Sequence, residues 1–185
     1  MTGWIRWPES GTLNRFLSVI LAIKQPDMVN LASALAQQFK EVHFTKDWVS
    51  TTSLKTQLEN TNWQQATARL GAHNTIAALA FHINYYIAGI IKVLEGGELD
   101  IHDQNSFDAP AIRSAEDWEA LKSRLWTDAK RFVALVAQMP ADRMHLPFAN
   151  KNYGSNYRNI NAMIQHIYYH LGQIVLLNKL LQQPV

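Results

Sequence analysis

Two long segments of the chain, about residues 74–94 and 158–181, carry apolar side chains at the spacing of an α-helix. Apolar residues that recur at intervals of three, four and seven lie on one face of a helix and form a stripe that faces a core. No segment alternates apolar and polar residues as a half-buried strand does, and no Asn-Gly hairpin turn occurs. The sequence therefore predicts an all-α fold. In the second segment the stripe consists of Met163, Ile167, Ile174, Leu177 and Leu181.

Two more long helices complete the predicted architecture. One is expected from Asp27, its N-cap, to about Val42, and the other from the capping sequence at Ser114 to the Met139-Pro140 stop. Residues 48–72 are rich in Ser, Thr and Asn and predict one or two short helices in a connection. The polar stretch from Glu98 to Arg113, which follows the helix breaker Gly96-Gly97, predicts a loop across one end of the fold. Four long helices predict a four-helix bundle whose side chains converge on an interior site.

Composition narrows the classes of function. At 185 residues and 48% hydrophobic residues, the chain is long enough for one complete core and needs no second domain. The absence of cysteine excludes disulfides, thiolate metal ligands and cysteine nucleophiles. The net charge is only +2, and the 17 Lys and Arg residues form no run of four, so no nucleic-acid partner is expected. An imidazole or carboxylate site is what the composition allows.

The start of the chain bears on where in the cell the protein is expected. Its longest apolar stretch, Phe16–Ile23, is far shorter than the ~20 residues that span a bilayer. Arg15 precedes this stretch as in a signal peptide, but Lys24 interrupts the approach to any small-residue cleavage site. We therefore expect a cytoplasmic protein without a membrane partner. Residues 1–27 are interpreted as an N-terminal extension with an additional helical segment, ahead of a bundle domain at residues 28–185.

His166 and His170 lie within or beside the apolar stripe of the last helix. Side chains four apart on a helix are one turn apart and separated by only about 40° around the axis, so the two rings can converge. An unpaired buried polar group costs roughly 1–3 kcal/mol, so each ring needs a partner. Each could be a core histidine bonded to a carbonyl or hydroxyl group, or the two together could bind one divalent metal ion.

His82 is the best candidate for a third ligand. It follows Leu79 and precedes Tyr86 and Ile90 at helical spacing, at the edge of the apolar face of the first long segment. Three neutral imidazoles would leave coordination positions open, as in catalytic rather than structural sites, and a coordinated water would be acidic enough to supply hydroxide near neutral pH. The other four histidines are predicted to face solvent or to cap helices: His43, His73, His102 and His145.

Further polar and aromatic residues accompany the proposed ligands. Gln173 lies about 20° from His166 around the same helix and could orient a ligand or a coordinated water from behind. It could equally be an ordinary polar residue at a helix flank. Tyr85, Tyr86 and Tyr169 are candidate pocket residues, one of which could polarise a substrate or relay a proton. The alternative for each is a packed ring whose hydroxyl finds a partner.

Several competing site chemistries are excluded. A ferritin-like di-iron site needs Glu-x-x-His repeats, and no glutamate is followed by histidine three residues later. A zinc-protease helix would carry Glu directly after its first histidine, but Ile167 follows His166. The glycine-rich loops that bind nucleotide phosphates are also absent. These absences leave the three-histidine arrangement as the main functional signal.

The order of these residues is similar to that of a known family. A mid-helix His82, followed some eighty residues later by His-x-x-x-His-x-x-Gln, resembles the DinB/YfiT-like superfamily of four-helix proteins that are proposed to be metalloenzymes. The likeness covers roughly residues 28–181. Besides the ligands, it includes the segments Thr75–Tyr86, Phe107–Pro110, Tyr153–Asn159 and Gln165–Ile174.

The resemblance implies several properties. It implies a four-helix bundle of unusual connectivity with a long crossover, in which His82, His166 and His170 form a metal triad completed by water or substrate. Some members of the superfamily are thiol-dependent transferases or isomerases, which implies a low-molecular-weight thiol as a second cofactor. Members often form homodimers, and Trp126, predicted to lie on an exposed face, is a candidate for such an interface.

Two classes of function follow. The first is a metal-dependent enzyme, a hydrolase or transferase, in which Zn²⁺, Ni²⁺ or a similar divalent ion activates water or a thiol against a small-molecule substrate. The second is a non-catalytic helical bundle that binds a metal or another ligand and acts as a dimeric interaction or sensor protein. The sequence leaves both open, because no acidic general base is identifiable near the three histidines.

Overall fold

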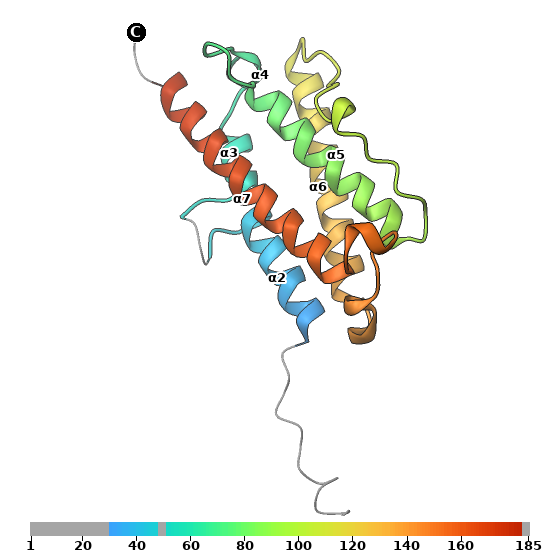
Figure 1. Cartoon of the computed structure of the whole chain (residues 1–185). Helices are drawn as coiled ribbons and strands as arrows, with labels where there is room; N and C mark the ends of the chain where they lie inside the picture. Colours follow the sequence, from blue (N-terminus) through green and yellow to red (C-terminus); the bar gives the residue numbers. More distant parts are fainter. Residues whose placement is uncertain (1–29, 48–50, 183–185) are drawn as a thin grey trace, which may run out of the picture.

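The computed structural model of the protein describes residues 30–47 and 51–182. These residues form six α-helices and three short 3-10 helices, and they contain no β-strand. The predicted all-α class is therefore confirmed for the described part of the chain. The elements, numbered as in Figure 1, are α2 (Leu31–Phe44), α3 (Leu54–Glu59), α4 (Trp63–Thr67), α5 (Ile76–Leu94), η1 (Asp103–Asn105), α6 (Ala115–Ala137), η2 (Ala141–His145), η3 (Lys151–Tyr153) and α7 (Asn156–Leu181).

The four long helices lie alongside one another, with the core between them (Figure 1). Helices α2 and α5 each pack against both α6 and α7, while the short α3 and α4 lie at one end of the long helices. The largest fully buried side chains are Trp118 and Phe132 on α6 and Phe39 on α2. Trp118 also donates a 2.8 Å hydrogen bond from Nε1 to the carbonyl of Thr61, which ties α6 to the connection between α3 and α4.

Local signals set most helix ends. Ser114 caps α6 by accepting a hydrogen bond from the backbone N–H of Asp117, and α5 ends just before Gly96, whose φ of 91° suits glycine. The last helix begins at Asn156, two residues earlier than predicted, because Ser155 supplies its cap. The first long helix is capped by Asn30 and begins at Leu31, later than predicted, because the Asn30 side chain accepts a hydrogen bond from the N–H of Ala32. The predicted cap Asp27 and the predicted N-terminal helical segment of residues 1–27 lie outside the described residues.

Helix α5 is long and apolar, with 19 residues and a mean hydropathy of 1.5, which by length and composition would suffice to cross a membrane. In the structure, 61% of its most apolar window is buried against the rest of the protein. Buried core helices share this composition, so it does not by itself assign α5 to a membrane.

The crossover between α5 and α6 runs along the outside of α5 (Figure 1). It can approach closely because position 89 is glycine. A Cβ atom added there would lie 2.6 Å from Cδ1 of Ile101, which is too close for two carbon atoms. Gly89 therefore lets the crossover pack directly against the side of α5 that carries His82.

Gly89→Ala is expected to destabilise the protein by about 1 kcal/mol. Overpacking against Ile101 costs roughly 1–3 kcal/mol, which exceeds the gain of up to about 1 kcal/mol from the better helix propensity of alanine. Urea unfolding measures the difference. In an Ile101→Ala background the obstruction is gone, so Gly89→Ala should then be neutral or stabilising. Equal destabilisation in both backgrounds would contradict the proposed contact.

Candidate metal centre

The three histidines singled out in the sequence lie together in the structure. Helix α5 contributes His82, and α7 contributes His166 and His170 from consecutive turns. One nitrogen of each ring can be chosen so that the three lie within 4.8 Å of one another. The ring centroids are separated by 5.0 Å for His82 and His166, 4.8 Å for His82 and His170, and 4.4 Å for His166 and His170. The expected convergence of the rings is therefore present.

The hydrogen bonding of the rings leaves nitrogen atoms available. Nδ1 of His82 and Nε2 of His166 are buried and have no hydrogen-bond partner among the described residues. His170 is bonded on one side only, where its Nδ1–H donates to Oε1 of Gln173 at 2.7 Å. That bond selects the tautomer whose Nε2 carries the lone pair. Gln173 thus makes the kind of hydrogen bond that orients a metal-binding imidazole through its other ring nitrogen.

Burial keeps the three rings neutral. Desolvation, followed by the charges of the other two histidines, lowers the pKa of His166 to about 4. Burial lowers the pKa of His82, with a further contribution from His170, and burial also lowers the pKa of His170. A neutral imidazole is the form that binds a metal ion. The rings are therefore in the ligating state at neutral pH.

The donor set fits a divalent cation. Two imidazole nitrogens that share one ion at about 2.1 Å are about 3.4 Å apart at the tetrahedral angle and at most about 4.2 Å apart. The separation of up to 4.8 Å must therefore shorten by roughly 1 Å when an ion binds, which requires small rotations of the rings. Unpartnered buried nitrogens give these rotations a driving force, because they regain a bonding partner.

The crossover segment covers the centre. The ring of Phe107 stacks on that of His82, with centroids 4.1 Å apart and planes 14° apart. Tyr86 packs against the rings of both His82 and His166, and its hydroxyl donates a 2.7 Å hydrogen bond to Oδ1 of Asp103. Asp103 is thus a carboxylate beside the histidines, and no sequence spacing signalled it.

A cavity of about 270 Å³ opens beside this cover, with His166 in its wall. Tyr86, Asp103 and Asn159 supply polar atoms, and the rest of the lining is mainly apolar. A small molecule in this cavity would contact a histidine of the centre and a carboxylate at the same time. The remaining lining residues are Ile90, Leu99, Ile101, Phe148, Tyr153, Ala162 and Met163.

Comparisons with known proteins complete the description of the centre. No family model, curated protein or solved structure matches the chain. The resemblance noted in the sequence therefore stays a prediction, and the functional argument rests on the geometry of the centre.

The three tyrosines named from the sequence have different environments. Tyr86 lines the cavity beside the histidines. Tyr85 is turned about 100° away on the same helix; its hydroxyl bonds the backbone of His102, at 3.1 Å to the carbonyl and 2.9 Å to the N–H, and its side chain lines a different cavity. Tyr169 is 65% exposed, although its ring lies 4.9 Å from that of His170.

Among the four histidines predicted to be solvent-facing or capping, His73, His102 and His145 are exposed. The prediction is wrong for His43, which is fully buried. Helix α2 continues through this residue, so His43 follows Phe39 by one turn on the buried face, where the two rings stack at 4.9 Å. Trp126 is likewise half-buried against His43 rather than on an exposed face, with the rings 5.9 Å apart.

Proposed function

We propose that the protein is a small metal-dependent enzyme, a hydrolase or thiol-dependent transferase of the DinB/YfiT-like four-helix type. His82, His166 and His170 would hold a divalent ion such as Zn²⁺ or Ni²⁺. The observation that carries the proposal is the meeting of three neutral imidazoles from two helices, two of which have a buried nitrogen without a partner. Such nitrogens weaken a core unless they bind something, so a ligand for them is expected.

The bound ion would supply a Lewis acid with open coordination positions and would lower the pKa of a coordinated water or thiol. The protein's own groups would do the rest. Asp103 lies at the wall of the 270 Å³ cavity, where its carboxylate can accept a proton from a nucleophile or substrate. Tyr86 holds that carboxylate in place through its 2.7 Å hydrogen bond. Phe107 covers one face of the His82 ring.

The cavity also limits the substrate. Its volume suits a small molecule, and its mainly apolar walls favour a substrate with a hydrocarbon body and one reactive polar group. Asn159 and Asp103 offer the polar contacts that would orient that group. Esters, amides and thiol conjugates of small apolar acids meet this description, so they form the panel for an activity screen.

Metal content is the decisive measurement. Purified protein is stripped with a chelator, reloaded with Zn²⁺, Ni²⁺ or Co²⁺, desalted and analysed by mass spectrometry of the elements. We expect about one ion per chain in the unaltered protein and below about a tenth of that in His166→Ala, since two imidazoles hold an ion far more weakly than three. His145→Ala removes an exposed histidine and serves as the matched control, with full metal content. Equal content in both variants would remove the proposal.

Activity is tested with the metal-loaded protein on the ester, amide and thiol-conjugate panel. Turnover should disappear on chelation and return when metal is added. Asp103→Asn should lower kcat by about 10²-fold or more if its carboxylate transfers a proton. Stoichiometric metal without turnover on any substrate would favour a non-catalytic metal-binding bundle instead.

Gln173→Leu is expected to weaken metal binding by about 10- to 100-fold, because His170 loses the acceptor that orients its ring. Gln173→Glu keeps an acceptor at the same reach and should bind metal about as tightly as the unaltered protein. Competition with a chromophoric chelator measures both affinities. If the two variants bind equally, the contact does not support the ligand.

A further inference from the structure

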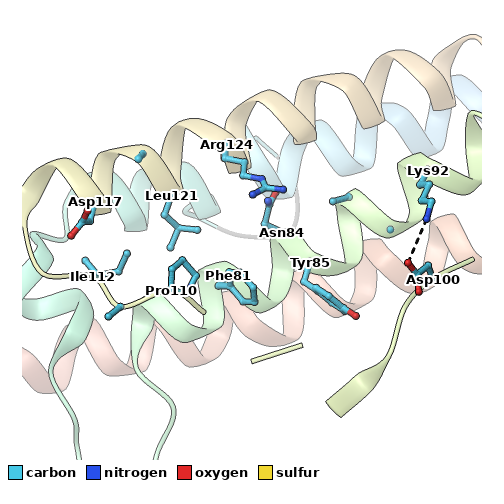
Figure 2. A pocket seen from close by; sticks show the side chains of 14 residues that line it. Phe81, Asn84, Tyr85, Lys92, Asp100, Pro110, Ile112, Asp117, Leu121 and Arg124 are labelled. Atoms are coloured by element: carbon cyan, nitrogen blue, oxygen red, sulfur yellow. Dashed lines mark hydrogen bonds and ion pairs between the residues drawn. The ribbon is translucent and has the colours of Figure 1, made fainter. Parts of the chain in front are cut away.

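A second, larger cavity of about 570 Å³ lies between α5 and α6, under the crossover segment. It shares no lining residue with the cavity beside the histidines and lies on a different face of α5. Figure 2 shows its walls: Phe81 from α5, Leu121 from α6, and Pro110 and Ile112 from the crossover. The metal centre therefore does not account for this space.

Small residues on the two facing helices leave the cavity open. Ala88 on α5 and Ala120 on α6 line it without filling it. Its volume falls within the range of about 300–1,000 Å³ that is typical of small-molecule sites. The lining is mostly apolar, with charged groups at the edges. Such a cavity suits a ligand with a hydrocarbon body and a single charged end.

One buried polar residue stands out in the lining. Asn84 is only 5% exposed, and it lies on α5 beside the core residues Ile83 and Ile87. Its Nδ2 donates a 3.1 Å hydrogen bond to Oδ2 of Asp128, and its Oδ1 is buried with no partner among the described residues. Asn84 is therefore a buried polar residue in the cavity lining that is held by its bond to Asp128.

Asn84 and Arg124 have a common partner in Asp128. The carboxylate that Asn84 holds lies 3.9 Å from Nε of Arg124, one turn earlier on α6. Figure 2 shows Arg124 and Asn84 among the side chains that line the cavity. Asn84 and Arg124 therefore approach the same carboxylate oxygen, Oδ2 of Asp128, at the edge of the cavity.

Of the two cations in the cavity lining, Arg124 has more hydrogen-bond donors free for a ligand. Its side chain is 73% exposed, and its single ion pair within the described residues is the long one to Asp128. Lys92, the other cation in the lining, is already paired with Asp100 at 3.5 Å, as the dashed line in Figure 2 marks. A guanidinium has several N–H donors in a planar fork that matches a carboxylate.

We infer that this cavity is a binding site for a small carboxylic acid with an apolar body. The carboxylate pairs with Arg124, and the hydrocarbon part lies against Phe81, Leu121 and Ile112. The site is independent of the metal centre and does not require the proposed enzymatic activity.

The test uses 3-phenylpropionate as the probe and isothermal titration calorimetry as the readout. The full chain is first treated with a chelator, so that the carboxylate cannot bind a metal ion at the histidines. We expect one saturable site per chain with a Kd of about 1 mM or tighter. The neutral analogue 3-phenylpropionamide should bind at least about tenfold more weakly, because it loses the charged pair with Arg124.

Three variants locate the site. Arg124→Gln should weaken binding of the acid at least about tenfold. Arg131→Gln, which removes a cation two turns further along α6 that pairs with Glu95 instead, should leave binding unchanged. Ala120→Leu alters an exposed position that lines the cavity and should abolish binding of the acid while the far-ultraviolet circular dichroism stays the same. The inference is overturned by an absence of saturable binding up to about 10 mM, or by binding that neither Arg124→Gln nor Ala120→Leu weakens.

Discussion

Addition of Zn²⁺ to the metal-free protein is expected to raise its melting temperature by about 10 °C. An ion that binds only the folded state at about 1,000 times its Kd stabilises that state by about 4 kcal/mol. For a chain of this size, each kcal/mol corresponds to roughly 2–4 °C. Because the three imidazoles come from α5 and α7, the ion links two helices that are far apart in sequence. Differential scanning calorimetry with and without Zn²⁺ measures the shift.

Two histidine variants and the pH dependence of the shift serve as controls for this prediction. His166→Ala should show little or no shift, whereas His145→Ala should show the full one. Protons compete with the metal only as the pH approaches the folded-state pKa values, and that of His166 is lowered to about 4. Because the pKa values of all three rings are lowered, the shift should be full at neutral pH and should be lost by about pH 4, where His166 also becomes protonated. A shift of the same size in His166→Ala would place the metal elsewhere.

Acid is expected to destabilise the protein through His43, by about 1.4 kcal/mol per pH unit below its unfolded-state pKa. Complete burial lowers the folded-state pKa of this residue from 6.5 to about 3. Above pH 6.5 both states hold the neutral ring, and the stability is fully present. Below that pH the unfolded chain takes up a proton that the folded chain excludes, so stability falls until the pH reaches about 3.

His43→Leu isolates this effect. The imidazole has no hydrogen-bond partner at either nitrogen among the described residues, so an apolar side chain of similar volume should raise stability at pH 7 by about 1–3 kcal/mol. The gain should grow by a further 2–3 kcal/mol at about pH 4.5. Urea unfolding at the two pH values measures both. His73→Leu, at an exposed position, should show no such growth. A pH-independent difference for His43→Leu would mean that the buried ring is protonated or solvated.

The helices of this protein were predictable because their signals are local. The cap at Ser114 and the stop before Gly96 act on neighbouring backbone groups. In the structure, α6 begins and α5 ends where the sequence predicts. The spacing of His166 and His170 was equally informative, since one helical turn brings two rings together whatever surrounds them. Their meeting with His82 followed from the apolar faces of two helices that had to share one core.

Other features were not readable from the sequence because they depend on how distant segments pack. The path of the crossover brings Asp103 and Phe107 over the histidines, and no local pattern determines that path. The burial of His43 depends on where α2 ends and on the aromatic rings of α6 that cover it. The hydrogen bond between Asn84 and Asp128 joins α5 to α6. Periodicity and capping act within a few residues, so the sequence alone was enough to predict the long helices and the grouping of the three histidines. Only tertiary packing decided what covers that trio and where the second cavity lies, because these arise from contacts between segments far apart in the chain.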